Sequence, residues 1–251
     1  MVPPVAAQQM RTVENNAFER GEKMVYRVYY NSILTGNVTA GEATLEVLPD
    51  NKMIDGREVM HLVSLGKTKG MFNMFYKVVN RYETYLDEQA IAPLYFMRRI
   101  RENKYKKDQD VFFDHVDLTA TTNTDTVPIT PYVQDIISAF YYARTYDYSD
   151  AQPGDEFEVD FFLDDSVYVT RIVFDGREKI KTRLGSFNTL RFKPMVLAGS
   201  VFSQPYPMTM WISDDKNKIP ILLESGIIVG KVRLELDDYQ GLRNPLSSKI
   251  D

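Results

Sequence analysis

Alternating apolar and polar residues run through most of this chain and predict antiparallel β-sheet. Four stretches carry apolar side chains at every second position: Met24, Tyr26, Val28 and Tyr30; Ala43, Leu45 and Val47; Phe157, Val159, Phe161 and Leu163; Ile228, Val232, Leu234 and Leu236. Strands of this kind place one face on a core and the other toward water, which is typical of antiparallel sheets. Phe162 is an apolar exception on the polar side of the third stretch. The pattern predicts a mainly β fold of about a dozen strands.

Two segments break this alternation and predict helix. Thr130 suits an N-cap and Pro131 suits the first helical position. One apolar helix face follows, which predicts an amphipathic helix over residues 131–146 and is formed by Val133, Ile136, Ile137, Phe140 and Tyr141. Met71, Met74 and Phe75 show the same spacing over a shorter distance, which predicts a single helical turn between two strands.

The sequences on either side of the longer helix resemble each other. Arg20–Tyr30 aligns with Pro153–Leu163, and the stretch from Gly56 aligns with the stretch from Gly185. "YETYLDEQAIAPLYF" matches "MTMWISDDKNKIPIL", with Asp87 and Pro93 spaced as Asp214 and Pro220 are. The order of the pairs is kept along the chain, which indicates an internal duplication. The alternative is that β-sequences with regular turns simply look alike.

The duplication leads to a domain plan. We expect a first β-repeat over residues 18–130, the linking helix over 131–146 and a second β-repeat over 152–240. The two repeats should form one structural unit of curved antiparallel sheets, either an open barrel or two facing half-barrels. Residues 1–17 are expected to be a disordered leader or the remnant of a signal peptide, because "VAAQ" has the small residues of a cleavage site. Residues 241–251 are expected to form a tail.

Composition removes several classes of function. The 251 residues are 44% hydrophobic and 26% charged, as is usual for a globular protein, and carry a net charge of -5. A negative net charge argues against nucleic acid as a partner, because phosphate binding needs a concentrated basic surface. The chain has no cysteine, so disulfides, thiolate metal sites and cysteine nucleophiles are excluded. No apolar run approaches the roughly 20 residues of a membrane-spanning helix.

Several sequence elements together resemble a known family. In chain order they are "GEKMVYRVYY", "GNVTAGEATLEV", "RYETYLD…P", "QDIISAFYYART", "FDGREKIKTRLGSFNTLRF" and "WISDDKNKIPILLE…VGKVRLEL". This set, from about Phe18 to Leu236, resembles the bacterial family known as domain of unknown function 3108. The resemblance implies an exported protein of a Gram-negative bacterium. It implies no activity, cofactor or catalytic residue.

Candidate catalytic groups are scattered. His61 and His115 do not lie at a metal-ligand spacing, and no G-x-S-x-G nucleophile motif is present. Adjacent carboxylates occur at Asp164-Asp165, Asp214-Asp215 and Asp237-Asp238, and Glu83 lies near Asp87, but turns and solvated faces account for such acids. The sequence therefore predicts no catalytic residue, metal or cofactor. A carboxylate-based hydrolase is the least favoured of the functions considered.

A basic run and two Met-rich clusters are the candidate binding residues. Arg98, Arg99 and Arg101 flank a predicted hairpin tip and are a hypothetical contact for an anionic surface, with a solvated hairpin as the simpler alternative. The hypothetical lining of an apolar site consists of Met71, Phe72, Met74, Phe75, Met208, Met210 and Trp211. Methionine and phenylalanine adapt to irregular ligands, but they also fill cores and partner-binding patches.

The function predicted from these observations is a non-enzymatic protein of the cell envelope, periplasmic or associated with the outer membrane. We expect it to hold a lipid or another apolar small molecule between its sheets. The alternative is a structural or protein-interaction module that uses the Met71–Tyr76 loop and an exposed sheet edge.

Overall fold

The computed structural model describes residues 10–32, 36–195, 208–227 and 230–250, and the alternating pattern becomes one antiparallel sheet of fifteen strands in these residues. Ile228 of the predicted pattern lies outside the described residues. The strands of the first half are β1 (Lys23–Ser32), β2 (Gly36–Val47), β3 (Lys52–Ile54), β4 (Arg57–Thr68), β5 (Val79–Asp87), β6 (Ala92–Glu102), β7 (Tyr105–Asp114), β8 (Thr119–Thr122) and β9 (Thr126–Pro128). Those of the second half are β10 (Glu156–Leu163), β11 (Ser166–Thr182), β12 (Gly185–Pro194), β13 (Met208–Ser213), β14 (Pro220–Gly226) and β15 (Lys231–Gln240). Two short helices, α1 (Phe72–Phe75) and α2 (Ser138–Ala143), complete the described elements.

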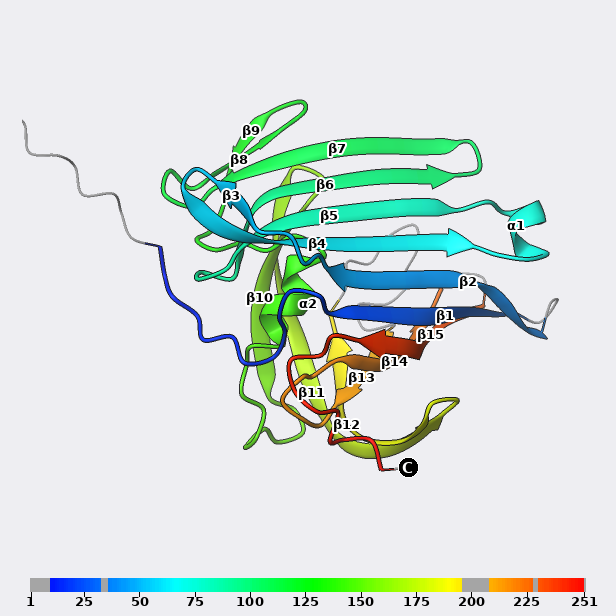
Figure 1. Ribbon diagram of the computed structural model, residues 1–251. Coiled ribbons are helices and arrows are strands. Elements are labelled where there is room, and N and C mark those ends of the chain that lie inside the picture. The colour runs from blue at the N-terminus through cyan, green and yellow to red at the C-terminus, as the bar shows by residue number, and fades with distance from the viewer. Residues whose placement is uncertain (1–9, 33–35, 196–207, 228–229, 251) are drawn as a thin grey trace, which may run out of the picture.

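The strands form a meander in which the first strand, β1, and the last strand, β15, are neighbours in the middle of the sheet. From one edge the order is β10 to β15, then β1, β2 and β4 to β9, while β3 pairs with β4. The pairing of β1 with β15 places Tyr26 opposite Leu236. β9 and β10 form the edges, so the sheet is open. Figure 1 shows β1, β2 and β4–β7 side by side in one layer, with β10 and β11 running steeply across them. The predicted mainly β fold with open, curved sheets is confirmed.

The core lies between these two parts of the sheet. Its largest cluster contains Phe18, Leu62, Phe96, Tyr141 and Phe162, so α2 and the edge strand β10 both pack on the β4–β7 layer. Phe162, the exception to the alternating pattern, is buried because Phe113 packs against it at a ring-centroid distance of 5.6 Å. β10 therefore contacts the core with both of its faces, although it is an edge strand.

Two more clusters extend this core along the second half of the sheet. One surrounds Met24, Tyr26 and Phe187 near the β1–β15 seam, and the other surrounds Tyr148, Phe174 and Phe192. Burial of aromatic and aliphatic side chains from all parts of the meander therefore holds the open sheet in its curved form.

The linking helix is shorter than the sequence predicted. The Gln134 N–H donates to the Asp160 carbonyl at 2.9 Å, and the Phe162 N–H donates to the Gln134 carbonyl at 2.7 Å, so residue 134 joins β10 in a parallel bridge. The Asp135 carboxylate then accepts bonds from the N–H groups of Ile137 and Ser138. Sheet pairing takes the backbone groups that a helix from residue 131 needs, and α2 begins only at Ser138.

Residues 10–17 lie against the rest of the molecule, which differs from the disordered leader expected over 1–17. Ala17 is buried, and the Arg11 guanidinium lies 4.3 Å from the Tyr132 ring centroid and 4.6 Å from that of Tyr142. The predicted tail is also ordered, because the Asn188 N–H donates to the Ser248 carbonyl at 2.9 Å. Residues 1–9 and 251 lie outside the described residues.

The β10–β11 turn reaches the first half of the sheet. Asp164 and Asp165 adopt left-handed backbone conformations at this turn, with φ of 49° and 59°. Asp164 forms ion pairs with Arg98 and Lys107, and Gln109 donates to Asp165 at 3.1 Å. These contacts tie the edge hairpin to β6 and β7.

The two halves of the sheet follow the same strand order. β1, β2, β4, β5 and β6 pair in succession, as do β10 to β14. A register shift follows Tyr85 in β5, where Leu86 pairs with Pro93, and another follows Trp211 in β13, where Ile212 pairs with Pro220. The internal duplication requires such a correspondence, and it stays a prediction.

Candidate functional site

A groove of about 560 Å³ lies between β1, β2, β4 and β15 at the end of the sheet that carries α1. It continues one face of β1: Met24 and Tyr26 on this face are buried in the core, whereas Val28 and Tyr30 line the groove. The alternating pattern of β1 thus supplies more apolar surface than the core covers.

The lining of the groove is largely apolar. Ala40, Val78 and Val232 contribute aliphatic surface, and the Phe72 ring of α1 packs edge-on against Tyr30 at a centroid distance of 5.6 Å. Glu42 and Lys67 add the charged groups of the lining. A cavity of several hundred Å³ with few polar groups is typical of sites for small apolar molecules.

Two glycines shape the groove. A Cβ added to Gly66 would meet no atom within 4 Å, so this position leaves open space in the lining. A Cβ added to Gly41 would lie 2.3 Å from the Lys67 carbonyl oxygen, so β2 can approach β4 only because residue 41 is glycine. Val28 pairs with Gly41 and Tyr29 with Thr39, which leaves Ala40 unpaired in a β-bulge.

The side chains on the outer side of α1 point away from the groove. Met71, Met74 and Phe75 are 75%, 81% and 81% exposed, and none of the helix residues is buried. The predicted helical turn is therefore present, but only Phe72 of the first Met-rich cluster lines the groove. We call the exposed residues Met71, Met74, Phe75 and Tyr76 the α1 tip.

The second Met-rich cluster lies elsewhere. Met210 packs against the core cluster around Phe192, and the Trp211 indole N–H donates to Glu178 at 3.0 Å. Met208 begins β13 and is half-buried. The described groove lining contains none of these three residues, so the two clusters predicted to share a site are not brought together there.

The three arginines of the basic run are paired within the chain. Arg98 is buried and bonds Asp164, Arg99 binds both oxygens of Asp110, and Arg101 binds both oxygens of Asp108. The predicted hairpin is present as β6 and β7, with Glu102 opposite Tyr105. Internal pairing argues against the predicted contact of these arginines with an external anionic surface.

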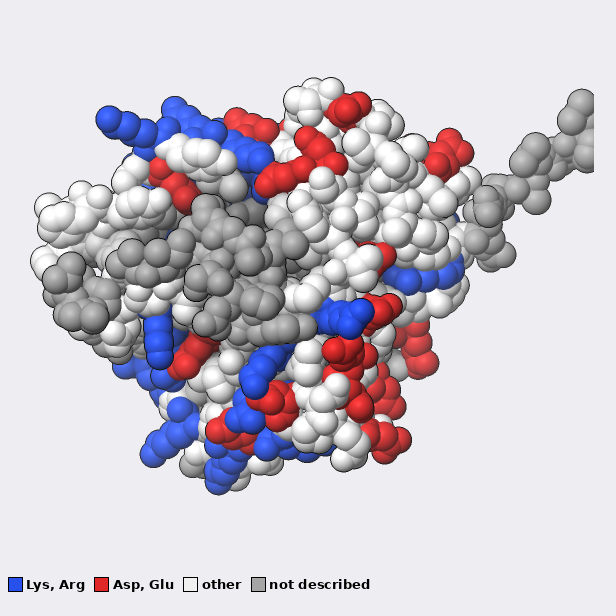
Figure 2. All heavy atoms as spheres, turned by 180° about the vertical axis from the view of Figure 1, so that it is seen from behind, with Lys and Arg blue, Asp and Glu red and all other residues white. Residues whose placement is uncertain are grey.

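Lysines, rather than these arginines, are the exposed basic residues of the segment after α1 and of the neighbouring β6–β7 hairpin end. The Asn103 N–H donates to the Lys77 carbonyl at 2.8 Å, which holds the β6–β7 turn beside the segment after α1. Lys77, Lys104 and Lys106 are exposed, and within the described chain no carboxylate forms an ion pair with them. Figure 2 shows basic residues gathered at the upper left, where the β6–β7 turn lies, above an uncharged lobe at the α1 end.

Both histidines are held by neighbours in the sheet. His61 Nε2 lies 2.6 Å from Glu83 Oε2, and its Nδ1 lies 2.9 Å from Lys52 Nζ. Burial acts to raise the pKa of Glu83, but bonds from Arg81 and His61 outweigh it and lower the pKa. His115 Nε2 lies 2.8 Å from the Pro93 carbonyl oxygen. No group of three His, Cys, Asp or Glu side chains among the described residues is arranged to hold a metal ion.

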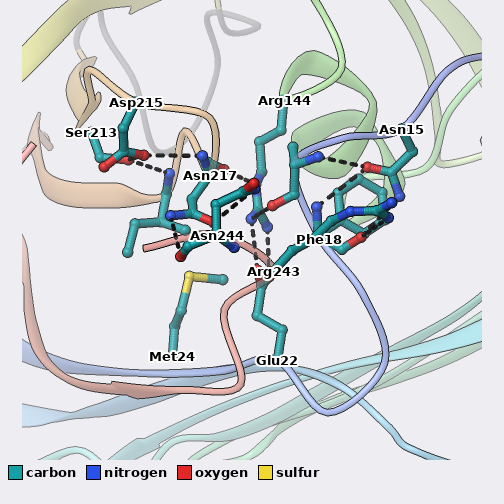
Figure 3. Close-up of polar contacts among 12 residues, drawn as sticks. Asn15, Phe18, Glu22, Met24, Arg144, Ser213, Asp215, Asn217, Arg243 and Asn244 are labelled. Atoms are coloured by element: carbon teal, nitrogen blue, oxygen red, sulfur yellow. Dashed lines mark hydrogen bonds and ion pairs between the residues drawn. The ribbon is translucent and has the colours of Figure 1, made fainter. Parts of the chain in front are cut away.

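A buried polar cluster joins both ends of the chain to the sheet (Figure 3). Arg144, at the end of α2, donates to the two Glu22 oxygens at 2.6 and 2.7 Å, and to the Asn217 carbonyl at 2.9 Å. The Asn217 side-chain amide in turn donates to the Asn244 carbonyl, and its Oδ1 accepts from the Asn244 N–H in the C-terminal segment. These side chains are occupied by one another, which indicates a structural role.

The family model for the protein of unknown function DUF3108 matches residues 25–237. The chain belongs to this family. A search of curated proteins returns no match to this DUF3108 protein. None of its described helices is long and apolar enough to cross a membrane.

Solved structures resemble this DUF3108 protein in fold. A β-barrel-like protein of the DUF1849 family from Brucella abortus has 10% sequence identity and a TM-score of 0.55, over 92% of this chain and 99% of that one. A candidate lipoprotein from Parabacteroides distasonis has 12% identity and a TM-score of 0.39, over 92% of this chain and 100% of that one. A candidate exported protein with a YmcC-like fold from Bacteroides fragilis has 9% identity and a TM-score of 0.35, over 91% and 99%. The first of these shows that the β-barrel-like fold is shared.

Proposed function

We propose that this DUF3108 protein is a non-enzymatic protein of the cell envelope that binds an apolar molecule, such as a lipid chain, in the groove beneath α1. The observation that carries the proposal is the largely apolar groove of about 560 Å³ that the described residues line. Its volume lies within the roughly 300–1,000 Å³ of small-molecule sites. The site lies at one end of the sheet, on the continuation of the core face of β1.

The residues that line the groove restrict the polarity of the ligand that it can bind. Val28, Val78 and Val232 favour a hydrocarbon chain, and the rings of Tyr30 and Phe72 add flat apolar surface. Glu42 is occupied by Lys67 at 3.6 Å and by a closer bond from Lys69. The hydrogen bond from Lys69 is the main cause that lowers the pKa of Glu42, so its carboxylate stays charged and paired. The lining therefore favours an apolar body over an ionic one.

Filling the groove tests this proposal. Gly66→Leu places a side chain in open space at a backbone conformation that other residues adopt, so we expect the protein to fold. The fluorescence of N-phenylnaphthylamine should rise on addition of wild-type protein, and this rise should be lost with Gly66→Leu. Thr126→Leu, at an exposed position of β9, is the matched control and should behave as wild type. Equal fluorescence with Gly66→Leu and wild type would refute binding in the groove.

A further inference from the structure

The α1 tip exposes large apolar side chains at a corner of the molecule where folding alone does not require them. Met74 and Phe75 are each 81% exposed, and no residue of α1 is buried. Because exposed side chains of this size gain roughly 1.5–3 kcal/mol each when they are buried, the tip has a strong tendency to leave water. The groove does not satisfy this tendency, since among these residues only Tyr76 also belongs to its described lining.

The charges next to the α1 tip indicate the kind of surface that the tip contacts. Lys77 follows the tip directly, Lys104 lies on the β6–β7 turn, which the Lys77–Asn103 bonds of 2.8 and 2.9 Å hold in place, and Lys106 lies at the start of β7. We call these three residues the lysine rim. The whole chain has a net charge of -5, so a basic rim at the apolar corner is a local exception. Because the rest of the chain is negative on balance, the lysine rim orients this corner of the molecule toward a negatively charged surface.

The size of the tip distinguishes a membrane from a protein partner. A stable protein interface buries about 800 Å² on each side and is formed by roughly 20–30 residues, whereas the tip consists of only four side chains on and beside the short helix α1. A small exposed group of Met and Phe with lysines on the adjoining segment and hairpin end instead fits the boundary between lipid chains and head groups. Tyr105, the first residue of β7 and 55% exposed, adds an aromatic ring of the kind found at that boundary.

We propose that the α1 tip inserts into the surface of an anionic phospholipid bilayer while the lysine rim contacts the head groups. Phe72 lies in the same helical turn and lines the groove, so docking would bring the groove to the lipid surface. The inference goes beyond ligand binding, and it stands whether or not the groove holds a molecule.

Sedimentation with lipid vesicles tests the inference. Full-length protein should bind vesicles of equal parts phosphatidylcholine and phosphatidylglycerol, bind pure phosphatidylcholine far less, and lose binding as ionic strength rises. The apolar variant Met71→Ser/Met74→Ser/Phe75→Ser should weaken binding about tenfold or more. The charge variant Lys77→Gln/Lys104→Gln/Lys106→Gln should weaken it to a similar extent.

Matched variants separate docking from general effects of surface chemistry. Met53→Ser/Phe112→Ser/Val116→Ser removes exposed apolar residues elsewhere, and Lys179→Gln/Lys181→Gln/Lys216→Gln removes exposed lysines elsewhere. Both should bind vesicles as wild type does, and circular dichroism should show all variants folded. Gly66→Leu should also bind vesicles, so loss of ligand binding and loss of docking remain distinguishable.

Three results would overturn the inference. They are failure of the wild type to bind anionic vesicles, wild-type binding by the two test variants, and an equal loss in the matched variants. A protein dimer that the apolar variant abolishes, without vesicle binding by the wild type, would assign the tip to a second copy of the chain instead.

Discussion

Single residues in the centre of the molecule carry charges that would destabilise the folded state if they were buried without a partner. Arg144 and Glu22 are both buried, with side chains 1% and 0% exposed, and the guanidinium also contacts the rings of Phe18 and Tyr141. Removal of one partner leaves the other charge without compensation. The sequence pattern shows Arg144 only as a polar residue near the end of the predicted helix, so the pairing over 122 positions could not be predicted from it.

Arg144→Met should lower the free energy of unfolding by about 3–5 kcal/mol, because it strands the Glu22 carboxylate in the core. Urea denaturation followed by circular dichroism measures this change. Arg171→Met, which breaks the exposed pair with Glu156, is the control and should cost about 1 kcal/mol or less. Equal losses for the two variants would contradict a central role for Arg144.

Asp135 should make stability depend on pH. Burial raises the pKa of this carboxyl from 3.8 to about 6, against the bonds from Ser138, Ile137 and Thr84. Between these values the folded state binds more protons than the unfolded state, so the contribution of Asp135 to stability falls as pH rises from about 4 to about 6. The contribution changes by about 3 kcal/mol over this range and stays low above it.

The difference between wild type and Asp135→Asn isolates this effect from other carboxylates. Asparagine keeps the acceptor for the Ser138 and Ile137 N–H groups but does not titrate. Relative to wild type, the variant should therefore gain stability as pH rises from about 4 to about 6. Urea denaturation across this range provides the measurement, and a constant difference would show that Asp135 does not titrate in the window.

At the scale of elements, the local sequence pattern predicted the secondary structure of a segment where contacts with neighbouring segments favour that same structure. The alternation of β1 and the helical spacing of α1 are both present in the structure. The segment before α2 follows helical spacing as well, but Gln134 pairs with β10 instead. Tertiary hydrogen bonds override local propensity there, and no local signal in residues 131–137 shows it.

Gly41→Ala should destabilise the sheet where β2 meets β4. The added methyl group would overlap the Lys67 carbonyl oxygen at 2.3 Å, so the two strands must separate. We expect a loss of roughly 1–3 kcal/mol in the free energy of unfolding. Gly66→Ala, in open space on β4, should have a smaller effect in the same denaturation experiment. A Gly41→Ala variant as stable as wild type would show that the bulge adapts.

At the scale of the whole molecule, the open meander leaves a groove because strands such as β1 extend beyond the end of the core. The pairing of β1 with β15 and the contact of Asp164 with Arg98 connect residues far apart in the sequence. Alternation shows which face of a strand is apolar, but it does not show which stretch of that face stays uncovered. For this reason the alternation does not separate the residues of the expected lining: Phe72 lines the groove, Met210 packs partly buried against the core, and Met74 projects into solvent.

The central claim is that the groove beneath α1 holds an apolar molecule. Native mass spectrometry of protein purified without detergent, followed by solvent extraction and lipid analysis, tests it most directly. We predict a bound apolar mass in the wild type and in Thr126→Leu, and its absence from Gly66→Leu. Wild-type protein that carries no bound mass, even after incubation with phosphatidylglycerol, would contradict the claim.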